Sequence, residues 1–168
     1  NRMWTYPYKT KPYEHQRNAL KESAEESQWA YFMEMGTGKT KVTIDNFAYL
    51  YFKKKINAVL IIAPKSVYTI WEDEIQTHLP NDIKYRIFKW NIDKPKQYEA
   101  LNKCKEFRMF LINVEALSTK RGLDACEDYL SKNILNFVVL DESTTIKNRQ
   151  AKRTKNIFRL RPLSHIRR

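Results

Sequence analysis

The chain has 168 residues, of which 42% are hydrophobic and 13% aromatic, and its formal net charge is +12. These numbers favour a packed globular fold over disorder and predict one domain over residues 1–168, because the chain is short for two separate cores. The longest strongly apolar run, AVLIIA at 58–63, is far too short to span a membrane, and the first ten residues lack the apolar core of a signal peptide. Two cysteines in unrelated contexts, Cys104 and Cys126, argue against a disulfide framework or a metal site. We therefore expect an intracellular protein with no membrane partner, cytoplasmic or, in a eukaryote, nuclear.

Apolar runs of strand length alternate with segments of helical period along the chain. The first expected helix carries an apolar face at i, i+3, i+4 and i+7, formed by Ile44, Phe47, Ala48 and Tyr51. A second helix is expected from Val67, Ile70, Trp71 and Ile75, where Trp71 belongs to the apolar face. The expected strands are residues 29–33, 58–63, 85–89, 109–113 and 137–140. This alternation predicts an α/β domain with a mostly parallel sheet and helices on both faces.

Residues 33–40, MEMGTGKT, lie between the first expected strand and the first expected helix. Their last three residues are those of a phosphate-binding loop, although Met33 stands where the usual pattern begins with glycine. The chain has three glycines, where average usage of about 7% would give roughly 12, and Gly36 and Gly38 are two of them. A nucleotide site is therefore predicted, and the alternative is a chance match at an ordinary turn.

The chemistry of such a loop assigns a role to each of its residues. Backbone N–H groups of Gly36, Thr37 and Gly38 would point at phosphate oxygens, assisted by the positive end of the following helix. Lys39 would place its charge on the β- and γ-phosphates of ATP, and the Thr40 hydroxyl would bind Mg²⁺.

A second acidic element completes the predicted site. Residues 136–143, NFVVLDES, place Asp141 and Glu142 directly after an apolar strand, at the sheet edge where ligands of open α/β folds bind. Asp141 would orient Mg²⁺ and Glu142 would polarise the attacking water. The alternative reading is a helix N-terminal cap.

Taken together, MEMGTGKT and LDESTTIKN resemble the first RecA-like lobe of a superfamily-two helicase, in particular the Swi/Snf-like branch. That branch typically has DEMGLGKT and DEAHRIKN at these two motifs. Three further stretches agree in order: PYEHQRNAL at 12–20, LIIAPKSVYTIWEDEI at 60–75 and LINVEALS at 111–118. The resemblance implies that Gln16 reads the adenine, and an amide suits this role because it both donates and accepts.

The chain departs from the family pattern at several positions. Met33 replaces an acidic residue, Thr144 stands where the family has histidine, and Asn113 and Val114 replace residues of the Thr/Ser type. The chain ends at FRLRPLSHIRR, just before the family's third motif, so the second RecA-like lobe and its arginine finger are absent from residues 1–168. We therefore expect this segment alone to be nearly inactive.

The resemblance implies an ATP-driven translocase on double-stranded DNA, with Lys65 and Ser66 as the expected backbone contacts of this lobe. Nine Lys/Arg and no Asp/Glu between residues 147 and 168 fit a nucleic-acid footprint, although a solvated basic tail gives the same composition. Two alternatives remain open: another superfamily-two helicase, of the restriction or RNA type, or a basic binding module that does not hydrolyse nucleotide. The Lys/Asn/Ile-rich composition hints at a bacterial or phage source.

Overall fold

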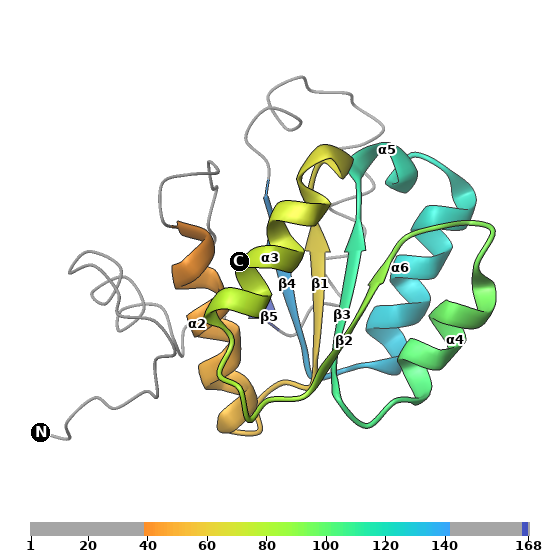
Figure 1. Cartoon of the computed structure of the whole chain (residues 1–168). Coiled ribbons are helices and arrows are strands. Elements are labelled where there is room, and N and C mark those ends of the chain that lie inside the picture. Colours follow the sequence, from red (N-terminus) through yellow and green to blue (C-terminus); the bar gives the residue numbers. More distant parts are fainter. Residues whose placement is uncertain (1–38, 142–165, 168) are drawn as a thin grey trace, which may run out of the picture.

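A computed structural model of the chain describes residues 39–141 and 166–167 (Figure 1). The predicted strand at 29–33 lies outside these residues. The elements run in the order α2 (Lys39–Phe52), β1 (Ala58–Ile62), a 3₁₀ turn η1 (Lys65–Val67), α3 (Tyr68–His78), β2 (Tyr85–Lys89), α4 (Pro95–Lys103), β3 (Phe107–Ile112), α5 (Val114–Leu117), α6 (Lys120–Lys132), β4 (Asn136–Leu140) and β5 (Ile166–Arg167).

The described strands form one parallel sheet in the order β2-β3-β1-β4-β5. From β1 the chain crosses to the edge strand β2, returns to β3 and then passes over β1 to β4, so a helix covers the sheet at each crossover. Parallel strands require such crossovers. The predicted α/β class and the parallel sheet with helices on both faces are confirmed.

Alternate residues of the central strand face two separate cores. Val59, Ile61 and Ala63 belong to the core beneath α2 and α3, whereas Leu60 and Ile62 belong to the core beneath α4, α5 and α6. All five β1 residues are buried, as expected for a strand covered on both faces. The continuous apolar run that predicted this strand reflects burial on both sides.

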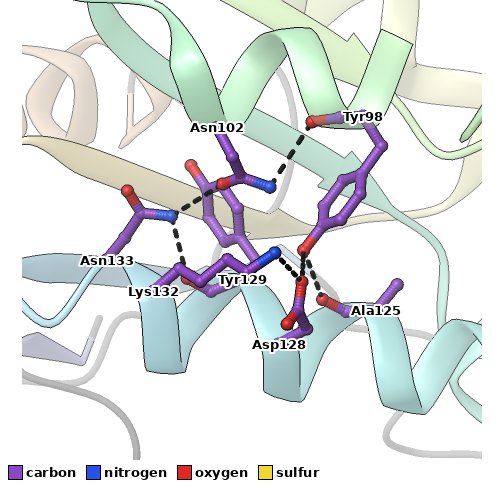
Figure 2. Close-up of polar contacts among 7 residues, drawn as sticks. All are labelled: Tyr98, Asn102, Ala125, Asp128, Tyr129, Lys132 and Asn133. Carbon is purple, nitrogen blue, oxygen red and sulfur yellow. Dashed lines mark hydrogen bonds and ion pairs between the residues drawn. The ribbon is translucent and has the colours of Figure 1, made fainter. Parts of the chain in front are cut away.

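A polar seam joins α4 to α6 on the second face (Figure 2). The Tyr98 hydroxyl donates to Asp128 Oδ2 at 2.7 Å, and Asp128 also pairs with Lys132 of its own helix at 3.1 Å. Near the other end of α4, Asn133 Nδ2 donates to Asn102 Oδ1 at 3.0 Å and to the Tyr129 carbonyl at 2.8 Å. The seam fixes the position of α6, whose N-terminal end lies on the side of the sheet to which the strands point.

Several predicted boundaries differ from the structure. β3 begins at Phe107 rather than at 109, because the guanidinium of Arg108 is bound by the Cys104 carbonyl and by Asn133, so a charged residue sits within the strand at low cost. In α3, Ile70 was predicted to be buried but is 44% exposed. Tyr68 is buried instead, beside Trp71 and Ile75. The expected apolar face of this helix was therefore wrong at one position.

Helix α2 ends in a left-handed turn at Lys54, whose φ is 59°. The Lys55 N–H donates to the Leu50 carbonyl and the Lys54 N–H donates to the Tyr51 carbonyl, each at 2.9 Å. This is the Schellman pattern, in which glycine is preferred at the left-handed position. Lysine bears a steric cost there that glycine does not.

We expect Lys54→Gly to stabilise the fold by about 0.5–1 kcal/mol, because relief of the left-handed strain exceeds the entropy that glycine adds to the unfolded chain. Urea unfolding of the two proteins measures this difference. Lys53→Gly is the matched control, because Lys53 does not have a positive φ and glycine should lower stability there. Equal effects at both positions would contradict the prediction.

Candidate functional site

Strand β4 delivers Asp141 to the carboxyl edge of the sheet. The Asp141 backbone N–H donates to the Ile62 carbonyl at 2.8 Å, which extends the β1–β4 pairing one residue beyond the strand. The residue is only 4% exposed. Its position next to the central strand is the one predicted for the metal-orienting carboxylate.

The side chain of Asp141 is held from α3. Trp71 Nε1 donates to Asp141 Oδ2 at 2.8 Å, across 70 positions of sequence. Burial raises the pKa of the Asp141 carboxyl above its usual value, and the hydrogen bond from Trp71 opposes that shift because it stabilises the charged form. Within the part of the chain that the structure describes, Oδ2 accepts the hydrogen bond from Trp71, and Oδ1 is the oxygen predicted to face a ligand.

Helix α2 begins at Lys39, and its first turns are buried. Thr40 is 4% exposed, and Lys41 pairs with Asp45 at 2.7 Å with both side chains buried. Burial raises the pKa of Asp45 to about 6, although Lys41 lowers it in part. In Figure 1 this end of the helix faces the side to which the strands point, as a phosphate-binding turn requires.

Lys65 and Ser66 follow β1 at the same edge of the sheet as Asp141. Pro64 ends the extended segment, and both Lys65 and Ser66 are exposed in η1, immediately before α3. Because β1 and β4 are neighbours in the sheet, the two predicted backbone-contact residues and the predicted metal ligand lie on adjacent strand ends.

A basic groove of about 850 Å³ opens beside Lys65, between the end of β2 and the start of α6. Its walls include aromatic rings from Tyr68, Phe88 and Trp90. Lys89 and Lys120 each pair with a nearby carboxylate, Glu72 at 3.3 Å and Asp124 at 2.9 Å. Among the described residues, the lining has no Asp or Glu and carries five cations: Lys65, Lys89, Lys94, Lys120 and Arg121.

This groove was not predicted from the sequence, where the densest positive charge lies in the C-terminal segment. The sequence signal for it was position. Lys65 follows β1, Lys89 is the last residue of β2 and Lys94 follows that strand, and Lys120 and Arg121 begin α6, so the parallel sheet gathers these cations at one edge. Asn113, at the end of β3, is used locally instead, because its Oδ1 accepts the Ala116 N–H at 2.7 Å and caps α5.

Several predicted site residues lie outside the described part of the chain: Gln16, Gly36, Thr37, Gly38 and Glu142. The structure therefore brings together Asp141, Lys65 and Ser66 at one edge and begins α2 at Lys39. Among the described residues, no group of three or more His, Cys, Asp or Glu side chains could hold a metal ion. No helix within the described residues is long and apolar enough to cross a bilayer.

Comparison with known proteins gives consistent matches. The family model of the SNF2-related domain matches residues 25–166. The chain is 32% identical to the putative ATP-dependent helicase/translocase YwqA of Bacillus subtilis, over 79% of this chain and 14% of that protein. It is also 32% identical to the transcription regulatory protein SNF2 of Saccharomyces cerevisiae, over 71% of this chain and 7% of that protein.

A solved structure shares the fold. The Sulfolobus solfataricus SWI2/SNF2 ATPase core in complex with dsDNA matches with a TM-score of 0.66 and 23% identity, over 92% of this chain and 31% of that chain. Relatives also include the SNF2 domain-containing protein ENL1 of Oryza sativa subsp. japonica, at 28% identity over 79% of this chain and 14% of that protein. Because similar proteins come from plants, fungi, bacteria and archaea, the hint of a phage or bacterial source is not supported. The chain spans between 7% and 14% of the length of the three curated relatives named above.

Proposed function

Because the chain belongs to the SNF2-related domain family, we propose that it is the ATP-binding motor lobe of a Swi/Snf-like ATPase that translocates on double-stranded DNA. One observation carries the proposal: the N-terminal end of the helix that begins within the GKT sequence lies on the side to which the strands point, and the buried Asp141 lies at that carboxyl edge of the sheet. Open α/β sheets bind ligands at this edge.

Different residues would contact different parts of ATP. The turn formed by Gly36, Thr37 and Gly38 would hold the phosphates through backbone N–H groups, and Lys39 would add a point charge. Gln16 would read the adenine edge, because its amide both donates and accepts. Glu142 follows Asp141 in sequence and would orient the water that attacks the γ-phosphate.

The described donors fit Mg²⁺. This ion prefers oxygen ligands and keeps several of its waters, so a single carboxylate and one hydroxyl suffice from the protein. Thr40 would supply the hydroxyl and Asp141 would supply the carboxylate, whose Oδ2 also accepts the hydrogen bond from Trp71. When bound, the ion would neutralise charge on the phosphates. The family's use of ATP supports the nucleotide; the choice of Mg²⁺ rests on this donor set.

The basic groove supports DNA as the partner. Its cations lie near the ends of two strands and at the start of one helix, and no acidic residue is among the described residues that line it. Phosphate contacts of this kind position a protein on a duplex without reading its sequence, as translocation requires. Lys65 and Ser66 are the proposed backbone contacts nearest to Asp141. A second RecA-like lobe in the full-length protein would complete the ATP site. The much greater length of the relatives supports the presence of such a lobe.

The test is ATP hydrolysis by the full-length protein, with and without linear duplex DNA, combined with displacement of a triplex-forming strand. We expect hydrolysis to rise on addition of duplex and the third strand to be displaced without separation of the duplex. Separation of the duplex strands would favour another superfamily-two branch, which the family match does not favour. Salt-sensitive DNA binding without any hydrolysis would favour a non-hydrolysing binding module and would refute the proposal.

A further inference from the structure

Trp71 lies beneath the predicted metal site rather than in it. Its side chain is 0% exposed and packs in the core formed by α2, α3 and one face of the sheet. Its indole N–H is directed at the Asp141 carboxylate, 2.8 Å from Oδ2. A tryptophan that only fills a core would need some partner for this N–H, and here the partner is the predicted carboxylate ligand of the metal.

The hydrogen bond restricts Asp141 in a specific way. An indole has one donor and no acceptor, so it can bind only the carboxylate form or the carbonyl oxygen of the acid. The Asp141 backbone is already fixed by its bond to Ile62. Main chain and one side-chain oxygen are therefore both fixed, and the rotation of the carboxylate is set before any ligand arrives.

We propose that Trp71 is a positioning residue, which holds the Asp141 carboxylate in the orientation that binds the metal of a metal–nucleotide complex. The inference rests on the proposed function, since it takes Asp141 as the metal ligand. Outer partners that orient metal ligands typically change metal affinity by about 10–100-fold when they are removed. Trp71 acts on metal binding and leaves the contacts between protein and nucleotide unaltered.

The experiment uses the full-length protein and two replacements of Trp71. Trp71→benzothienylalanine keeps the ring size and replaces the N–H with sulfur, so it removes the donor with little change in packing. Trp71→Phe removes the donor and some volume. Ile75→Val is the matched control, because Ile75 lies one turn further along α3, is equally buried and has no polar group.

Two affinities are measured: that of Mn²⁺ in the presence of ADP, from the electron paramagnetic resonance signal of free Mn²⁺, and that of a fluorescent ADP analogue in excess EDTA. We expect both Trp71 variants to bind Mn²⁺ about 10-fold more weakly or worse, with nucleotide affinity in EDTA unchanged. Ile75→Val should alter neither affinity. Mn²⁺ affinity equal to wild type in the benzothienylalanine variant would overturn the positioning role while the proposed function stood. A wild-type protein that binds no nucleotide would instead overturn the proposed function.

Discussion

Lys39→Ala is expected to lower the affinity of the protein for ATP by ~100-fold or more. The lysine would place a charge against two phosphates of the nucleotide, and charge-assisted hydrogen bonds contribute about 1.5–3 kcal/mol each, with 1.4 kcal/mol equal to a factor of ten. Loss of this group leaves phosphate charge that the backbone N–H groups alone must stabilise. Equilibrium binding of a fluorescent ATP analogue with Mg²⁺ measures the change.

Lys53→Ala is the matched control for this experiment. It removes the same charge just beyond the other end of α2, about 20 Å away along a helix of this length, and should leave ATP affinity unchanged. If Lys39→Ala binds ATP as well as wild type does, the phosphate-loop assignment is wrong. If both variants bind ATP weakly, the loss of affinity reflects the overall charge of the protein, and the phosphate-loop assignment loses its support.

Residues 1–168 alone are expected to hydrolyse ATP at least ~10³ times more slowly than a longer chain that carries a second RecA-like lobe. The physical reason is the arginine finger that the family supplies from that lobe, since such a residue is worth roughly 10³–10⁵ in rate. Phosphate release from both proteins, with saturating duplex DNA, measures the ratio.

Binding serves as the internal control for the short chain. Residues 1–168 should still bind Mg²⁺–ATP weakly, and Lys39→Ala should remove that binding. A folded short chain that shows robust DNA-stimulated turnover would mean that this lobe supplies every catalytic group itself. Such a result would reject a site shared between two lobes while leaving the nucleotide pocket in place.

The central part of the fold could be predicted because its strands are buried on both faces. A run such as AVLII at 58–62 has no polar side to obscure it. Helices α4 and α6 were not predicted. In α6, Leu123, Cys126 and Leu130 follow a helical spacing that was overlooked among charged residues, whereas α4 has almost no apolar pattern. Leu101 is the one buried side chain of α4. Their positions depend on polar contacts such as Tyr98–Asp128, which no periodicity reveals.

In the candidate site, too, features with a local sequence pattern could be predicted and long-range contacts could not. Asp141 could be predicted because a carboxylate directly after an apolar strand is a local pattern. Its hydrogen bond with Trp71 could not, since 70 residues separate the two and only the pairing of β1 with β4 brings α3 over the end of β4. Trp71 was expected in the core, and the structure confirms this. The basic groove was missed for the same reason, because its cations come from three separate stretches of chain.

The short segment from Lys65 to Trp71 has a mechanical consequence. Lys65 and Ser66 stand exposed at the groove, and only six positions later the indole is fixed to Asp141, with η1 and α3 running continuously between them. A duplex strand that pulls on the first turn would therefore tilt the indole and the carboxylate with it. Thr144 replaces the histidine through which the family links its ATP site to the next motif. If Lys65 and Ser66 contact a duplex as proposed, α3 would couple that contact to the orientation of the Asp141 carboxylate.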